Sequence, residues 1–102
     1  MESGFIGILS FDVHFAESHS LKGKRHELLR LKQALQRRLG AAVAEVDGHE
    51  LWQRSRLTVA LVDRRARDCA TRLDEAERLV LASGHEAGPF RREVVTPEDL
   101  EP

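Results

Sequence analysis

Residues 5–15 alternate between apolar and polar side chains in the manner of a β-strand with one buried face. The apolar side chains share odd positions: Phe5, Leu9, Phe11, Val13 and Phe15. The polar side chains share even positions: Ser10, Asp12 and His14. Because successive side chains of a strand point to opposite faces, the apolar set needs a second layer to cover it. The rest of the chain has to supply that cover.

The spacing of apolar residues changes to that of a helix over residues 21–39. Five leucines recur at helical spacing: Leu21, Leu28, Leu31, Leu35 and Leu39. On a helical wheel they lie within about 80° of arc, which predicts one stripe facing a core. Ser20 is expected to cap this helix, because its hydroxyl can accept an unpaired backbone N–H, and Gly40 is expected to end it.

The same two periods predict the remaining elements: a strand over 41–47, a strand over 57–62, a helix over 64–82 and a strand over 90–96. The alternation of the second strand fails at Ala44 and Glu45, which indicates a β-bulge or an edge position. Asp63 is expected to cap the second helix. Residues 97–102 are acidic and offer little to bury, so this tail is expected to fray.

The element order is therefore β-α-β-β-α-β. Two right-handed crossover connections on one antiparallel sheet give an α+β ferredoxin-like sandwich, with a four-stranded sheet and both helices on one face. The 102 residues fit a single domain, 1–102, with an ordered core over about residues 5–96. The other face of the sheet is left for solvent or a partner.

Three segments resemble the YlxP-like family of small bacterial proteins. They are HFAESHSLKGKR at residues 14–25, VAEVD at 43–47 and ELWQR at 50–54. The resemblance extends over about residues 5–96 and implies a ferredoxin-like fold. It implies no established reaction and no catalytic residues. In many bacteria, genes of this family lie near those for a translation initiation factor and ribosome-binding factor A, which is an association and not a mechanism.

Basic residues are concentrated in the first predicted helix, although the whole chain has a formal net charge of −1. Residues 19–38 hold one acid, Glu27, against seven cations: Lys22, Lys24, Arg25, Arg30, Lys32, Arg37 and Arg38. The local charge is therefore +6. Such an asymmetry can mark an anionic partner even when the total is near zero.

Within this helix, one stripe opposite the leucines is polar and carries no acid: Lys22, His26, Arg30, Gln33 and Arg37. The cations at its start oppose the positive end of the helix dipole, which costs about 0.3–1 kcal/mol each unless an anion docks there. The candidate residues for contact with an anion or an RNA backbone are Lys22, Lys24, Arg25, His26, Arg30 and Arg37. The alternative is a solvated basic face neutralised by Glu17, Asp47, Glu50 or the acidic tail.

Two further surfaces are candidates for partner contact. Trp52 lies in the polar connection beside Arg54, where it either covers one end of the core or anchors a partner, because Trp and Arg are enriched at binding hot spots. The uncovered sheet face is expected to show Ile8 and Ala60 among small and apolar neighbours. A homodimer could bury that face.

No constellation in the sequence predicts catalysis, a metal site or a cofactor. His14, His19 and His26 lack the spacing of a metal site on one helix, and Cys69 is the single cysteine. His14 beside Asp12 suggests an acid–base pair but lacks a third, orienting group. The outer sheet face carries no Phe, Tyr or Trp for base stacking, so any RNA contact is expected to involve phosphates.

Three hypotheses for function follow. The first is a non-enzymatic accessory protein in the cytoplasm, associated with RNA or the ribosome (ribosomal RNA or a ribosomal protein) through the basic helix face. The second is a protein–protein or homodimerisation module that uses the open sheet face and the Trp52 loop. The third is a domain that binds a small anion at the Ser20–Arg25 turn. No membrane partner is expected, because no apolar run approaches the roughly 20 residues of a membrane span and the N-terminus lacks a signal peptide.

Overall fold

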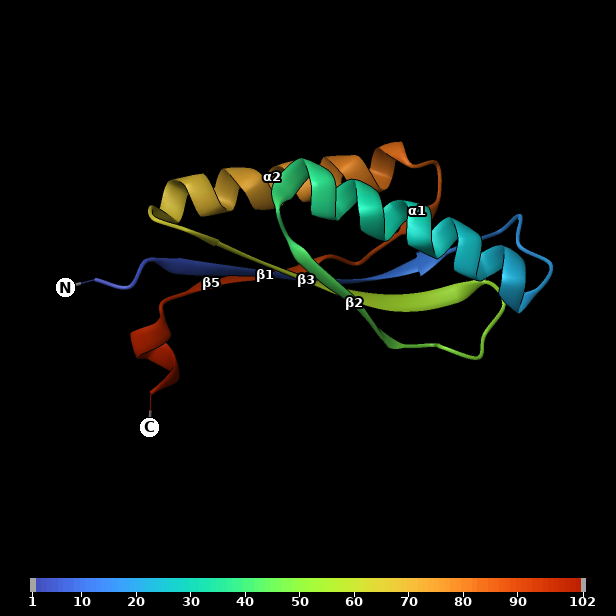
Figure 1. The fold of residues 1–102 in the computed structure, drawn as a ribbon, viewed down its shortest axis with the longest axis horizontal. Helices are drawn as coiled ribbons and strands as arrows, with labels where there is room; N and C mark the ends of the chain where they lie inside the picture. Colours follow the sequence, from blue (N-terminus) through green and yellow to red (C-terminus); the bar gives the residue numbers. More distant parts are fainter. Residues whose placement is uncertain (1, 102) are drawn as a thin grey trace.

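The computed structural model describes residues 2–101. Its elements follow one another in this order: β1 (Phe5–His14), α1 (Leu21–Leu39), β2 (Ala42–Asp47), β3 (Arg54–Asp63), α2 (Ala66–Ala82), β4 (Glu86–Ala87), β5 (Arg91–Val95) and the 3-10 helix η1 (Pro97–Leu100). Both long helices cover one face of the sheet, and η1 lies on the opposite side (Figure 1).

The sheet is antiparallel with β1 at its centre. Every residue of β1 is paired with β3, from Phe5 opposite Asp63 to His14 opposite Arg54. β2 lies outside β3, while β4 and β5 both pair with the free side of β1. This topology confirms the ferredoxin-like α+β fold.

The fourth predicted strand, over 90–96, is confirmed as β5 (Arg91–Val95), but the structure adds a short strand, β4, that the sequence pattern did not predict. Gly88 has a φ of 125° and Pro89 has no N–H to donate, so the ladder breaks between the two strands. The N–H of Gly88 still donates to the Asp12 carbonyl of β1 at 2.9 Å. The sheet therefore has five strands where the sequence pattern predicted four.

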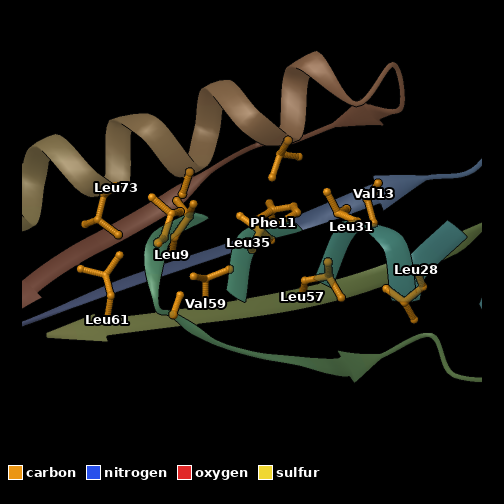
Figure 2. Close-up of a cluster of buried hydrophobic side chains, with 14 of the residues drawn as sticks. Leu9, Phe11, Val13, Leu28, Leu31, Leu35, Leu57, Val59, Leu61 and Leu73 are labelled. Carbon is orange, nitrogen blue, oxygen red and sulfur yellow. The ribbon is translucent and has the colours of Figure 1, made fainter. Parts of the chain in front are cut away.

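The core lies between the sheet and the two helices (Figure 2). The labelled side chains come from four elements: Leu9, Phe11, Val13, Leu28, Leu31, Leu35, Leu57, Val59, Leu61 and Leu73. Each is 7% exposed or less. The predicted faces of β1 and β3 are therefore confirmed. Cys69 is also fully buried here, and burial raises the pKa of its thiol.

The ends of α1 form as predicted. The Ser20 hydroxyl accepts the N–H of Gly23 at 3.0 Å, and Gly40 ends the helix with a φ of 59°. Glycine suits that position because it carries no Cβ to clash in the left-handed region. The predicted bulge in β2 is also present, as the register shifts between Glu45 and Asp47.

The start of α2 differs from the prediction. Asp63 does not cap the helix, which begins at Ala66 after Arg65 without a side-chain cap. The Asp63 carboxylate instead accepts the N–H of Arg64 at 2.7 Å and the guanidinium of Arg72 at 3.2 Å. The hydrogen bonds from the Arg64 N–H and from Arg72 hold the pKa of Asp63 below the ordinary value, although desolvation acts to raise it.

The tail after β5 is also more ordered than expected. Residues Pro97–Leu100 form η1, in which the Thr96 hydroxyl accepts the N–H of Asp99 and the Asp99 carboxylate accepts the N–H of Thr96. This reciprocal capping box satisfies two backbone donors that would otherwise be unpaired. Among residues 2–101, no helix has the length and apolar character needed to cross a bilayer.

Candidate functional site

Lys24 does not belong to the exposed cationic surface. Its side chain is 1% exposed, and its ammonium donates to the Glu45 carboxylate at 3.1 Å. It also donates to the carbonyls of Gly48 at 2.7 Å and of His49 and Arg54 at 3.4 Å each. The assignment of Lys24 to an external anion site is therefore wrong, because an acid of the same chain already holds it.

Glu45 is the anionic partner in this buried cluster. Its carboxylate also accepts the hydroxyl of Ser55, which is fully buried. Burial acts to raise the pKa of Glu45, but the hydrogen bonds from Ser55 and Lys24 outweigh it and hold the pKa below the ordinary value. A charged Glu45 is thus built into the end of the fold where α1 begins.

The wheel position of Lys24 is a sequence signal of its burial. Lys24 lies four residues before Leu28, on the same side of the helix as the buried leucines. Glu45 likewise lies on the core-facing side of β2, opposite the buried Leu57 of β3. A cation on the apolar stripe and an acid on the inner face of a strand were the available signal of a buried ion pair.

The other α1 candidates do lie at the surface. Five exposed side chains follow the outward face of the helix: Lys22, Arg25, His26, Arg30 and Arg37. Arg30 lies 3.8 Å from the Glu27 carboxylate. Within residues 2–101, the other four form no ion pair with a carboxylate. We call this set the α1 basic face. Its contact with an anion stays a prediction.

The expected neutralising acids form no ion pair with the α1 basic face within residues 2–101. Glu17 and Glu50 enter no ion pair within the described part of the chain, and neither does Asp47. The acids of the tail lie at η1, and Glu98 accepts the N–H of Ser3 there. Neutralisation of the basic face by these acids at longer range stays a prediction.

The Ser20–Arg25 turn offers less to a small anion than its sequence indicated. The N–H of Gly23 already donates to the Ser20 hydroxyl, and the N–H of Lys24 donates to the Ser20 carbonyl at 3.1 Å. The Lys24 ammonium faces inward. Two backbone donors and one cation are thus satisfied within the protein.

Trp52 does not cover the core, because 59% of its surface is exposed. It lies beside Leu51, also 52% exposed, in a groove of about 540 Å³ that His14, His19 and Arg54 help to line. The structure therefore contradicts the core-covering role. The second role, contact with a partner, stays a prediction for both Trp52 and Arg54.

The loop that carries Trp52 is fixed at both ends. Lys24 binds three of its carbonyls, as described above. The Gln53 side chain donates to the carbonyls of Ala16 at 3.2 Å and Ser18 at 3.0 Å, and the N–H of Phe15 donates to the Gln53 carbonyl at 2.7 Å. The three segments that carry the family resemblance, at residues 14–25, 43–47 and 50–54, thus meet at one end of the molecule.

The open sheet face divides into an apolar and a charged end. Ile8 pairs with Ala60 and both are half-buried, while Val62 near one end is 69% exposed. At the other end, Arg56 donates to Asp12 at 2.8 Å, and that hydrogen bond lowers the pKa of Asp12. Between the two ends, the hydroxyls of Ser10 and Thr58 are 2.9 Å apart.

The suggested acid–base pair of His14 and Asp12 does not form. Asp12 is engaged by Arg56, and His14 Nδ1 lies 3.7 Å from the Glu86 carboxylate. Within residues 2–101, no three His, Cys, Asp or Glu side chains are grouped so that they could hold a metal ion. His14, His19 and His26 are accordingly not brought together as ligands.

The layers and strand order define a ferredoxin-like α+β domain. Two solved structures share this fold. A VAO-type flavoprotein from Myceliophthora thermophila C1 superposes with a TM-score of 0.55 at 8% identity over 91% of this chain. A hydantoinase/carbamoylase family amidase from Burkholderia ambifaria also gives 0.55, at 13% identity over 91%. This chain spans 16% and 29% of those longer proteins, so the similarity concerns the fold alone.

The family is given by the sequence. A family model described as protein of unknown function (DUF503) matches residues 6–87, and the chain belongs to that family. The match includes α1 and the Trp52 loop and ends at the last residue of β4. No curated protein matches the chain in sequence.

Proposed function

We propose that this protein is a non-enzymatic accessory protein that binds RNA through the α1 basic face. One observation carries the proposal: Lys22, Arg25 and Arg37 are exposed and have no carboxylate partner among the described residues. Cations that the fold does not neutralise are available to a phosphate backbone. The resemblance to YlxP-like proteins makes ribosomal RNA in the cytoplasm the first ligand to test.

The contact would be made mainly with phosphates. Phosphate contacts release condensed counterions, so affinity falls steeply with salt and carries little sequence information. The outward positions of β1 and β3 in the described chain hold no Phe, Tyr or Trp on which bases could stack. Helix α1 therefore contributes charge, not base recognition.

The test compares two triple charge reversals of equal size. Lys22→Glu, Arg30→Glu and Arg37→Glu alter the α1 basic face, whereas Arg64→Glu, Arg67→Glu and Arg78→Glu alter exposed cations at the start of α2 and along it. Binding of purified ribosomal RNA is measured at several salt concentrations. The α1 variant is expected to lose affinity roughly tenfold or more at low salt, with a log–log salt slope smaller by about 2. Equal losses in both variants would contradict the proposal.

A second candidate is self-association through the open sheet face. The specific observation in its favour is the exposed Val62 at one end of a face that also carries Ile8 and Ala60. Two copies could bury these side chains with their sheets about 10 Å apart. Light scattering at micromolar concentration tests it: a dimer that Ala60→Glu dissociates supports the candidate, and a monomeric parent protein contradicts it.

A further inference from the structure

The groove beside Trp52 combines an exposed aromatic ring with basic side chains. Trp52 and Leu51 provide its apolar surface, and His14, His19 and Arg54 provide its basic groups. No carboxylate is among the residues that line it. His14 has Glu86 at 3.7 Å, whereas Arg54 forms no ion pair within residues 2–101. Arg54 also borders an adjoining pocket that Asp12 and Asp47 help to line. A partner that fits this groove is anionic and presents a flat apolar surface.

The backbone of the loop that carries the exposed Trp52 ring is held by hydrogen bonds on both sides of the ring. The carbonyls of Gly48, His49 and Arg54 on both sides of Trp52 accept hydrogen bonds from the buried Lys24. Gly48 has a φ of 83°, and a Cβ there would lie 2.8 Å from the Arg54 carbonyl, so the loop closes too tightly for another residue. A fixed loop loses little conformational freedom when a ligand binds to it.

The groove lies at the same end of the molecule as the start of α1. Ser18 and His19, which precede α1, line the groove, and the first exposed cation of the helix, Lys22, follows three residues after His19. The loop and the N-terminal end of α1 lie at the same end of the molecule (Figure 1), where Lys24 joins them. The groove and the α1 basic face therefore begin at the same end of the domain.

We propose that Trp52 stacks on a base of single-stranded RNA while Arg54 and His19 contact the adjoining phosphates. Every base has a π-face, so stacking on an aromatic ring combined with a basic groove suits single strands of varied sequence. In a duplex the bases are already stacked within the helix and the ring cannot reach them. This inference rests on the proposed function, to which it adds a preference for unpaired RNA.

The experiment uses the fact that Trp52 is the single Trp and that the chain has no Tyr. Intrinsic fluorescence of the parent protein therefore reports on this ring alone, and the affinities of the parent protein and of every variant are measured by fluorescence anisotropy of dye-labelled RNA. A 12-nucleotide oligouridine and an RNA duplex of equal length serve as probes for the parent protein and for Trp52→Leu. Leu81→Ala, which truncates an apolar side chain on α2 that is 56% exposed, is the control. Trp52→Phe, which keeps an aromatic ring, is expected to retain part of the binding.

Oligouridine is expected to quench the Trp52 fluorescence, and Trp52→Leu is expected to bind it roughly tenfold more weakly. Duplex binding should change by less than about twofold, since the α1 basic face is intact. If the α1 reversal abolishes binding but Trp52→Leu leaves oligouridine affinity unchanged, the inference fails and the proposed function stands. If neither probe binds the parent protein, both fail. If Trp52→Leu loses a protein partner from nuclease-treated lysate but keeps oligouridine affinity, the groove is a protein contact and the inference is overturned.

Discussion

The two helices cover the same sheet face but differ in the charged and capping residues at their starts. Helix α1 has no acid in its first turn and begins with the Ser20 side-chain cap, whereas α2 has no side-chain cap and carries Asp68 in its first turn. The second helical residue is an exposed cation in both: Lys22 in α1 and Arg67 in α2. Only α2 places a negative charge beside that cation, which complements the helix dipole.

Further along the two helices, the charged side chains also differ in their partners. On α2, Arg72 binds the carbonyl of Val62 at 2.9 Å and the Asp63 carboxylate, and Asp74 and Glu77 both bind Arg92 of β5. On α1, Lys24 binds Glu45 and Arg30 lies near Glu27, while Lys22, Arg25 and Arg37 have no such partner in residues 2–101. Arg72, Asp74 and Glu77 thus hold α2 to β3 and β5. Arg67 and Arg78 are exposed and form no ion pair within residues 2–101, but acids of the same helix, among them Asp68 and Asp74, lie near them in the sequence. In α1 the single acid Glu27 stands among the cations, and this local excess of positive charge is what favours an anionic ligand there.

The largest expected effect is on the free energy of unfolding, and it distinguishes Lys24 from Lys22 in the first turn of α1. Lys24→Met removes the partner of a mostly buried Glu45 and is expected to lower the free energy of unfolding by about 3–5 kcal/mol, the usual range for breaking a buried pair. Lys22→Met removes an exposed cation and should change it little. Urea denaturation followed by circular dichroism measures both. Equal effects of the two substitutions would show that the Lys24 cluster is not a buried ion pair.

The second expected effect is a loss of folding stability at low pH. Because the folded-state pKa of Glu45 lies below its ordinary value of 4.5, its stabilising effect is complete above that value and is lost as the pH falls through the folded-state pKa. The parent protein should therefore lose more stability than Glu45→Gln between pH 5 and strongly acid solution. Denaturation midpoints at a series of pH values measure this. Parallel curves for the two proteins would exclude Glu45 as a contributor.

The smallest expected effect is a gain in stability when an acid replaces the exposed cation at the second residue of either helix. Lys22→Glu and Arg67→Glu each place an acid at the second residue of a helix, where it is favoured by about 0.3–1 kcal/mol at low ionic strength. Both variants should be at least as stable as the parent protein, yet only Lys22→Glu should weaken RNA binding. Thermal unfolding and RNA titration of the same samples provide the two readouts. A Lys22→Glu variant that gains stability and keeps full affinity would remove Lys22 from the α1 basic face.

Local patterns were enough to predict most of the fold. Alternation along β1 predicted its buried face, and the residue types of Ser20 and Gly40 predicted both ends of α1. Along β3 both sets of side chains are apolar or small, so its alternation alone did not decide which set is buried. Strand β4 was missed because its two residues, Glu86 and Ala87, are too few to show an alternation, and Gly88 and Pro89 separate it from β5. The order of the tail was also readable in principle, as Thr96 and Asp99 have the spacing of a capping box.

The candidate site was less predictable because charge alone does not tell where a side chain lies. Lys22 and Lys24 are two residues apart and of the same type, but 100° per residue puts one outside and the other over Glu45. The exposure of Trp52 was not readable either. It depends on Lys24, Gln53 and the backbone of the loop, which come together only in the folded chain.

The most direct test of the central claim is to map RNA contact onto the two helices. Isotopically labelled protein is titrated with a ribosomal RNA fragment at low salt, and backbone amide shifts are followed by two-dimensional NMR. The account predicts that shifts concentrate at Lys22, Arg25, His26, Arg30 and Arg37 and at the Trp52 loop, while the exposed residues of α2 move little. Shifts centred on α2 or on the open sheet face, with α1 unchanged, would contradict it.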